Sequence, residues 1–273
     1  MTWSSLRVDP GPDREAVLAV LFGAGAQGVH EDGAHLVTHF PAETDVAAVV
    51  AEVRTVSANA TCVVAVAPAT DWSVAWRDRL LAHGVGRLTV APPWLAEGLD
   101  PATTIVIDPG MAFGTGDHPT TRGALRLLEP VLAPGMVVAD LGAGSAVLAI
   151  AAAKLGASHV FAVEYDGEAI GNAQENVARN GVADVVDVFE GDAGAFLPLV
   201  APVDLITANI ISSVLVELLP AMFAALRPGG RVVLAGILAE ERDSMLEALT
   251  ADGWTVLAED TEETWWSLTI ARS

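Results

Sequence analysis

The residues best suited to ligand chemistry form a short turn, Asp140–Ala146, with the sequence DLGAGSA. The apolar run 136–139 before it predicts a strand, and the Ala/Leu/Ile-rich run Val147–Leu155 after it predicts a helix. A strand, a tight turn and a helix N-terminus place backbone N–H groups and a positive dipole end against a ligand. Gly142 and Gly144 let the backbone approach that ligand closely. We therefore expect a nucleotide-like ligand at this turn.

The turn alone does not identify the ligand, because glycine turns also occur in dinucleotide-binding folds. A dinucleotide fingerprint has the pattern Gly-x-Gly-x-x-Gly. Its sixth position is Val147 here, so one of the three glycines is missing. A second segment, Phe113–Thr121 with the sequence FGTGDHPTT, lies upstream and is polar and glycine-rich. It makes the signal more specific than a generic nucleotide fold.

An acidic side chain follows the next predicted strand. Glu164 comes 22 residues after Gly142, where a carboxylate accepts hydrogen bonds from both ribose hydroxyls of a bound nucleoside. Asp166 points the other way if the strand continues, and helix N-capping suits it better. The interpretation without a ligand is that either carboxylate is simply solvated.

Two further polar residues follow the third and fourth predicted strands. Asp192 stands where a carboxylate commonly meets an adenine amino group in this kind of fold, although a loop cap explains it equally well. Asn209 offers a carbonyl oxygen to hold an attacking amine and an NH2 group to hold a cofactor. The alternative for Asn209 is a cap of the following helix. Both residues fall where the ligand crevice of a parallel sheet opens.

From about residue 111 onward, strands alternate with helices, which predicts a parallel, doubly wound α/β sheet. The predicted strands are Val137–Leu141, His159–Glu164, Val185–Glu190, Val203–Ala208, Arg231–Gly236, Trp254–Glu259 and Trp265–Ala271. The predicted helices are Thr121–Leu132, Val147–Leu155, Gly167–Asn180, Ser213–Leu226 and Ala239–Ala251. Only residues 260–264 join the last two strands, so these must form an antiparallel hairpin. This seven-stranded arrangement is the layout of Class I methyltransferases.

Residues 1–67 predict a separate small domain. Strands at 3–9, 28–31, 36–40 and 61–67 and helices at 13–22 and 45–56 give the order β-α-β-β-α-β, a ferredoxin-like arrangement. Such a unit either recognises a substrate or serves as a packing module. Residues 68–110 predict a connector with a short helix carrying Trp72 and Trp76 and a strand at 104–107. The third predicted region, residues 111–273, carries the glycine turn.

Composition limits the partners. The formal charge of −21 argues against direct binding of nucleic acid and favours a basic partner. The alternative is that the charge only confers solubility. A single cysteine excludes an intrachain disulfide and a cysteine-based metal site, and no metal-ligand cluster is apparent. Neither a signal peptide nor an apolar run long enough to cross a membrane is seen. We expect a cytoplasmic monomer without a membrane partner.

Taken together, residues 108–121, Asp140–Ala146 and 208–210 resemble the PrmA family, methyltransferases that act on the large-subunit ribosomal protein L11. The resemblance covers essentially the whole chain. It implies S-adenosylmethionine as cofactor and lysine side-chain and N-terminal amines of a basic ribosomal protein as acceptors. The family's catalytic position falls on Asn209. The expected cofactor-binding residues are Phe113, Gly114, Thr115, Thr121, Gly142, Gly144, Glu164, Asp192 and Asn209.

Three positions depart from the family's usual pattern. Glu164 stands where the family usually has Asp, which preserves the chemistry with one more methylene group. Asp117 stands where Thr is common and alters the charge of the loop. Ala146 replaces a usual glycine, and its methyl group is expected to tighten the pocket slightly.

Transfer to an amine requires positioning and a neutral nitrogen. Phe113 and Ile210 are expected to form part of an apolar pocket that lowers the pKa of the amine. His118 either accepts the proton or shapes the loop while water accepts it. Thr121 is expected to bind the cofactor's carboxylate, to cap the following helix, or both. Two other functions fit the same scaffold, a small-molecule methyltransferase and a non-catalytic cofactor-binding scaffold.

Overall fold

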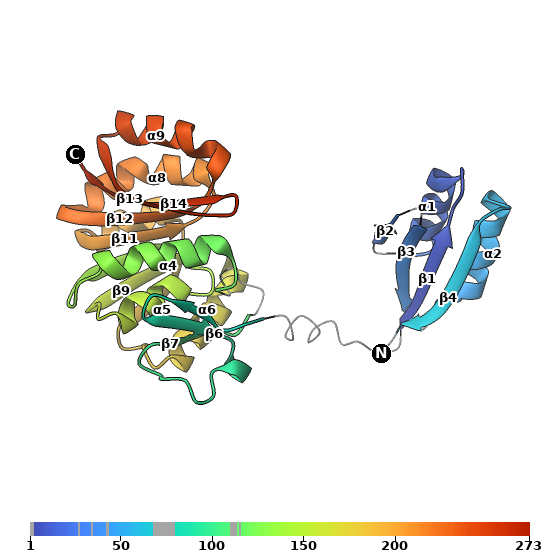
Figure 1. Ribbon diagram of the computed structural model, residues 1–273, viewed down its shortest axis with the longest axis horizontal. Coiled ribbons are helices and arrows are strands. Elements are labelled where there is room, and N and C mark those ends of the chain that lie inside the picture. The colour runs from blue at the N-terminus through green and yellow to red at the C-terminus, as the bar shows by residue number, and fades with distance from the viewer. Residues whose placement is uncertain are drawn as a thin grey trace. The chain divides into compact units, whose positions relative to one another are not determined.

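The structure is a computed structural model that describes residues 3–26, 28–33, 35–41, 44–67, 80–109, 114 and 116–273. The chain divides into two compact units, Met1–Arg79 and Leu80–Ser273 (Figure 1). The predicted helix with Trp72 and Trp76 lies outside the described residues. Residues 80–109, which the sequence assigns to a connector, belong to the second unit.

The first unit has the predicted β-α-β-β-α-β order. Its elements are β1 (Trp3–Asp9), α1 (Arg14–Gly23), β2 (Val29–Asp32), β3 (His35–Pro41), α2 (Val46–Val56) and β4 (Thr61–Ala67). The strands pair antiparallel in the order β2-β3-β1-β4. Alternate strand residues such as Leu6, Val8 and Leu36 pack against Val17 and Leu21 of α1. This confirms the ferredoxin-like arrangement.

The second unit contains the predicted seven-stranded sheet. Its strands are β8 (Val137–Leu141), β9 (His159–Glu164), β10 (Val186–Glu190), β11 (Val203–Asn209), β12 (Leu226–Leu238), β13 (Trp254–Glu262) and β14 (Trp265–Arg272). Their spatial order is β10-β9-β8-β11-β12-β14-β13. The strands from β10 to β12 are parallel, and β14 runs antiparallel to both β12 and β13. The doubly wound sheet with a reversed hairpin is confirmed. Its order reverses between β8 and β11, where such sheets bind ligands.

Helices cover both faces of this sheet (Figure 1). They are α4 (Pro119–Val131), α5 (Val147–Lys154), α6 (Gly167–Arg179), α7 (Ala193–Val200), α8 (Ser212–Ala225) and α9 (Arg242–Ala251), with the 3-10 turn η3 (Ala239–Glu241). One core joins α4, α5 and α6 to one face of the sheet. A second core joins α7, α8 and α9 to the other face. The sheet is thus buried on both sides, as its parallel strands require.

A small three-stranded sheet precedes α4 in the second unit. It consists of β5 (His83–Val85), β6 (Leu88–Ala91) and β7 (Thr104–Val106), and the 3-10 turn η2 (Pro93–Leu95) lies between β6 and β7. Val85, Leu88, Val90 and Ile105 pack into the same core as α4 and α5. Only the strand at 104–107 is predicted from the sequence, because strands of three or four residues carry little periodicity.

Several elements differ from the sequence prediction, among them β13, which extends to Glu262, and the predicted helix at 239–251, which is η3 followed by α9. Helix α4 begins at Pro119 rather than at residue 121 because proline is well suited to the first turn of a helix. Helix α7 was not predicted, since it is short and contains Pro198. Strand β12 is longer than predicted and begins at Leu226, where α8 ends. No helix in the described part of the chain is both long and apolar enough to cross a membrane.

Candidate active site

The predicted glycine turn connects the end of β8 to the start of α5. Its backbone is left-handed at Gly142 (φ +68°) and Gly144 (φ +53°), a conformation that glycine adopts at little cost. The N–H groups of Gly142 and Ala143 donate to the Val163 carbonyl of β9 at 2.9 and 3.0 Å. A Cβ on Gly142 would lie 2.4 Å from Cγ2 of Ile210. Glycine is therefore needed there for both its φ and the close approach of the chain after β11.

A cavity of about 490 Å³ opens beside this turn, where the strand order reverses. Five predicted site residues line it: Gly114, Gly142, Gly144, Glu164 and Asn209. Ile210, predicted for an apolar pocket, lines it too. Phe113 and Thr115 lie outside the described residues.

A second cavity of about 400 Å³ adjoins the first. The two share Gly142, Glu164, Ile210 and Val214 in their linings. The second also reaches Asp192, so the structure brings this predicted residue to the same region. The two cavities therefore meet at the end of the glycine turn, beside Glu164.

Ala146 does not line either cavity among the described lining residues. Its side chain is fully buried in the core beneath α5. The prediction that its methyl group tightens the pocket is therefore wrong. Its backbone is left-handed, with φ +65°, a conformation that glycine adopts at lower cost than alanine.

Glu164 ends β9 and lines both cavities. Its Oε2 accepts from the Gly144 N–H at 2.8 Å, and its Oε1 accepts from the Asp166 N–H at 2.9 Å. Each oxygen of a carboxylate has a second lone pair. The side chain is thus held by the backbone and still able to accept hydrogen bonds from a ligand.

The other two acidic candidates are helix caps. Asp166 caps α6 and accepts from the Glu168 N–H at 2.9 Å, as predicted. Asp192 caps α7 and accepts from the Ala195 N–H at 2.8 Å. Asp192 therefore has a capping role, which was the alternative that the sequence offered for it. It also lines the second cavity.

Asn209 is the last residue of β11 and lines the larger cavity. Its Oδ1 is buried and has no hydrogen-bond partner among the described residues. Leaving a buried acceptor unpaired costs about 1–3 kcal/mol, so this oxygen is ready to receive a donor from a ligand. The capping alternative is wrong, because Ile211 is the N-cap residue of α8.

The N-terminus of α4 differs from its prediction. His118, not Thr121, is the N-cap, and its Nδ1 accepts from the Thr120 N–H at 3.3 Å. The His118 ring packs edge-on against Trp265, with centroids 5.0 Å apart. His118 therefore shapes the loop, and burial followed by the charge of Arg122 lowers its pKa. Thr121 is fully buried and its Oγ1 lacks a partner among the described residues, whereas Thr120 lines the cavity.

Asp140 lies fully buried beneath the turn. Its Oδ2 accepts from the Ala149 N–H of α5 at 3.1 Å, and its Oδ1 accepts from the Thr207 hydroxyl of β11 at 2.7 Å. Burial raises the pKa of this carboxyl to about 6, against the two hydrogen bonds that lower it. One carboxylate thus joins the glycine turn to the strand that carries Asn209.

The donor set fits an adenosyl cofactor better than a metal ion. The described residues contain no group of three or more histidine, cysteine or acidic side chains placed to hold a metal. They do contain a fixed carboxylate at Glu164, an unpaired buried oxygen at Asn209 and a glycine turn at a helix N-terminus. The carboxylate suits ribose hydroxyls, the unpaired oxygen suits a polar donor, and the glycine turn lets a ligand approach the protein backbone closely.

Comparison with known proteins decides among the families that share this fold. The family profile described as Ribosomal protein L11 methyltransferase (PrmA) matches residues 14–273. The chain belongs to this family. The resemblance seen in the sequence is thereby confirmed.

Individual PrmA relatives agree with this assignment. The ribosomal protein L11 methyltransferases of Symbiobacterium thermophilum and Chloroflexus aurantiacus are both 42% identical, over 212 and 226 residues. The alignments cover 74% of this chain and 65% and 69% of those proteins, so it spans about two thirds of the curated relatives' length. A crystal structure of a ribosomal protein L11 methylase from Lactobacillus delbrueckii subsp. bulgaricus is 31% identical, with a TM-score of 0.64. It covers 71% of this chain and 99% of that one.

Several residues of this PrmA-family site were not predicted from the sequence. The cavity lining also contains Ile211, Val214, Gly236 and Trp265, besides His118 and Thr120 of the predicted segment Phe113–Thr121. Gly236 has φ +86°, and a Cβ there would lie 2.4 Å from the Ile210 carbonyl oxygen. The sequence signal for Gly236 is a glycine at the end of a predicted strand. Trp265 has no comparable sequence signal, because its place depends on how the hairpin packs.

Proposed function

We propose that this protein transfers methyl groups from S-adenosylmethionine to lysine side-chain and N-terminal amines of ribosomal protein L11. The observation that carries the proposal is the buried, unpaired Oδ1 of Asn209 in a cavity bordered by the glycine turn. Family membership supports the reaction class, since the matched profile and curated relatives bear that activity in their names.

The cofactor is assigned to the two joined cavities. Glu164 accepts hydrogen bonds from the ribose hydroxyls, while Gly142 and Gly144 allow close approach to the helix N-terminus. Asp192 lines the second cavity and would hold the adenine amino group, and Thr120 lines the larger cavity. Thr121 stays a predicted contact. Bound there, the cofactor supplies an electrophilic sulfonium methyl group.

Asn209 is assigned the central role in the transfer. Its Oδ1 accepts an N–H from the attacking amine and thereby aims the nitrogen lone pair at the methyl group. The new N–C bond forms as the S–C bond breaks, and the electron pair of the broken bond remains on sulfur. The chain supplies positioning rather than a covalent nucleophile.

The amine must be neutral before it reacts. Deprotonating a free lysine at neutral pH costs roughly 4 kcal/mol. Ile210, Val147 and Leu148 give the cavity an apolar lining, which disfavours the charged amine and lowers its pKa. Water accepts the proton, because the Nδ1 of His118 is bonded to Thr120 as a helix cap.

Residues 1–67 are proposed to recognise the protein substrate, and 68–110 to connect this unit to the catalytic region 111–273. A formal charge of −21 favours attraction to a basic ribosomal protein. Each unit has its own hydrophobic core. Removing residues 1–67 is therefore expected to lower methylation of L11 while cofactor binding persists, and full methylation would contradict this role.

The proposed function is tested with labelled S-adenosylmethionine and purified L11. The wild type should label L11, and Asn209→Ala should transfer at least about 100-fold more slowly through lost positioning. Cofactor affinity should fall no more than about tenfold, the cost of one hydrogen bond. Asn172→Ala is the matched control, because Asn172 lies outside both cavity linings and bonds Asp108.

Three outcomes would overturn the proposal. Wild-type protein that leaves L11 unlabelled has another substrate or none. Label transferred to a small amine in place of L11 identifies a small-molecule methyltransferase. Cofactor binding without transfer to any amine identifies a non-catalytic scaffold.

A further inference from the structure

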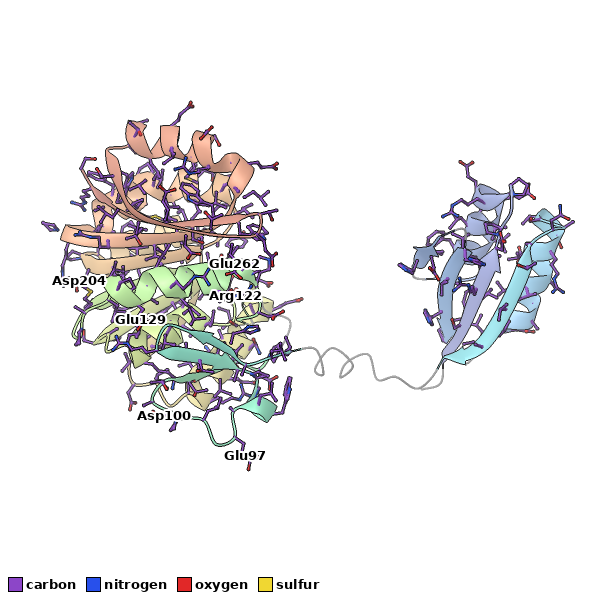
Figure 2. The ribbon with its side chains drawn as sticks, viewed as in Figure 1. Glu97, Asp100, Arg122, Glu129, Asp204 and Glu262 are labelled. Carbon is purple, nitrogen blue, oxygen red and sulfur yellow. The ribbon has the colours of Figure 1, made fainter. Side chains whose placement is uncertain are left out.

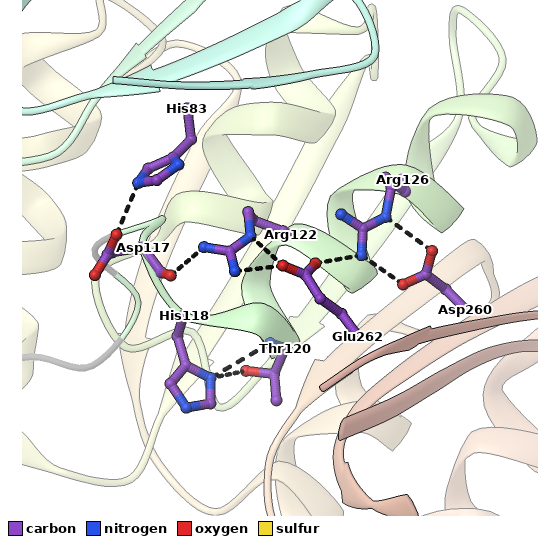
Figure 3. A network of polar contacts seen from close by, with 8 residues as sticks. All are labelled: His83, Asp117, His118, Thr120, Arg122, Arg126, Asp260 and Glu262. Carbon is purple, nitrogen blue, oxygen red and sulfur yellow. Dashed lines mark hydrogen bonds and ion pairs between the residues drawn. The ribbon is translucent and has the colours of Figure 1, made fainter. Parts of the chain in front are cut away.

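A group of four charged side chains holds the C-terminal hairpin against α4 (Figure 3). This group, here named the clamp, consists of Arg122, Arg126, Asp260 and Glu262. Nε of Arg122 donates to Oε1 of Glu262 at 2.9 Å. Arg126 donates to Oε2 of Glu262 at 2.7 Å and to Oδ2 of Asp260 at 2.8 Å.

Arg122 also reaches the loop that enters the cavity. Its guanidinium donates to the backbone carbonyl of Asp117, one residue before the helix cap His118. The same side chain therefore contacts the loop on one side and the hairpin on the other (Figure 3). A planar guanidinium suits this task, because its donors point in fixed directions.

The two segments that Arg122 joins each present an aromatic ring to the cavity. Glu262 pairs directly with Trp265 across the hairpin. Trp265 packs edge-on against His118, with centroids 5.0 Å apart and ring planes at 67°. Both rings line the cavity that contains Asn209. The clamp thus fixes both sides of one aromatic wall.

The burial of the clamp distinguishes it from an ordinary surface ion pair. Only 17% of the Arg122 side chain and 28% of the Glu262 side chain are exposed. The hydrogen bond from Arg122 keeps the pKa of the Glu262 carboxyl below its usual value, so this group is charged at neutral pH. Paired, directional contacts of this kind hold a geometry that a solvated pair does not.

We propose that Arg122 and Glu262 are positioning residues that set the Trp265–His118 wall relative to Asn209, and so control the rate of methyl transfer. This inference rests on the proposed function, because the wall matters only if an amine reacts in this cavity. The clamp residues need not touch the cofactor or the amine. They act through the two rings they hold.

The decisive variant is Glu262→Gln, which keeps the size of the side chain and removes its charge. The Arg126–Asp260 bond remains and keeps the hairpin attached to α4. We expect kcat to fall about tenfold, within the range that a displacement of up to 1 Å causes. The Kd for S-adenosylmethionine should change less than threefold, because Glu164 and the glycine turn are untouched.

The matched control is Asp204→Asn, which weakens an Arg–carboxylate pair at the opposite end of the strands. Asp204 lies near the start of β11 and accepts from Arg227 at 2.8 Å. Figure 2 shows Asp204 at one side of α4 and the labelled pair Arg122 and Glu262 at the other. This control should leave kcat unchanged. Equal losses of kcat in both variants would reduce the clamp to a general stabiliser and overturn the proposal.

A readout independent of catalysis separates this inference from the proposed function. In protein labelled with 5-fluorotryptophan, Trp265→Phe identifies the fluorine NMR signal of Trp265. Glu262→Gln and Arg122→Gln should each shift that signal, and the double variant should shift it no further, as coupled residues do. An unmoved signal would overturn the clamp's positioning role even if L11 is methylated. A shifted signal in protein that does not methylate L11 would instead contradict the proposed function alone.

Discussion

The two sides of the larger cavity are built in different ways. On the β8–β9 side, Glu164 and the glycine turn are held by backbone hydrogen bonds between segments that are neighbours in the sheet. On the hairpin side, Trp265 lies on β14, and ion pairs such as Arg122–Glu262, whose members are 140 residues apart in sequence, join the hairpin to α4. We call the first side the cradle and the second side the wall.

This difference suggests that one side of the cavity serves the cofactor and the other serves the methyl acceptor. A cradle fixed by backbone geometry suits the cofactor, which is the same in every reaction cycle. A wall held by side chains suits the acceptor, because small changes in the clamp alter its position without unfolding the sheet. Substitutions in the cradle should therefore weaken cofactor binding or stability, and substitutions in the wall should slow transfer.

The largest effect is expected from Glu164→Ala in the cradle. In the proposed function, removing the carboxylate would delete hydrogen bonds to the ribose hydroxyls, each worth about 1.5–3 kcal/mol. The Kd for S-adenosylmethionine should rise about 100-fold or more, as isothermal titration calorimetry would show. Asp166→Ala is the matched control, because Asp166 caps α6 two residues away. It should cost about 1 kcal/mol of stability and leave the Kd within about threefold; comparable losses of affinity would argue against the role of Glu164.

The next effect concerns the carboxylate beneath the turn. The pKa of Asp140 rises from 3.8 to about 6 on folding, so the folded state binds more protons than the unfolded state between these values. The free energy of unfolding therefore falls as pH rises through this window, by about 3 kcal/mol from this group. Asparagine does not titrate in this pH window, so Asp140→Asn should lose this part of the pH dependence of the free energy of unfolding. Urea unfolding at pH 4 and pH 7.5 measures it, and an unchanged difference between the two pH values would refute the assignment.

A smaller effect should separate two left-handed residues of the same turn. Gly142→Ala introduces a left-handed alanine, which costs about 1–2 kcal/mol, and a Cβ 2.4 Å from Cγ2 of Ile210. Ala146→Gly relieves the same strain but loses a buried methyl group and adds freedom to the unfolded chain, so its net change should stay within about 1 kcal/mol. Thermal unfolding of both variants tests this contrast. Equal destabilisation would mean that φ is not what selects glycine in the turn.

Much of the cradle could be predicted because its signals are local. The glycine turn, Glu164 and Asn209 each follow a strand whose apolar run is visible in the sequence. Parallel strands bring such positions to one edge of the sheet, so their convergence follows from topology. Asp140 was part of the predicted turn, but its bond to Thr207 depends on β11 lying beside β8.

The wall could not be predicted, because its contacts join residues that are far apart in sequence. Nothing near Glu262 in sequence indicates Arg122, and a tryptophan such as Trp265 at the start of a strand is most simply a core residue. The sequence offers Thr121 as one candidate for the cap of α4, and His118 takes that place although histidine is not among the usual capping residues. Long-range side-chain pairs leave no periodic pattern, whereas turns and strand ends do.

The smallest effect is expected from Asp117, at the edge of the wall. Nε2 of His83 on β5 contacts Oδ1 of Asp117 at 2.7 Å (Figure 3). Half of the Asp117 side chain is exposed, so the pair should contribute less than about 1 kcal/mol. Arg122 binds the Asp117 backbone carbonyl rather than its carboxylate, so Asp117→Thr leaves that anchor in place. We expect kcat for this variant within about twofold of wild type and a melting temperature within a few degrees. A loss as large as that of Glu262→Gln would instead extend the wall's control to β5, and the side chain rather than the backbone of Asp117 would then be what holds the loop.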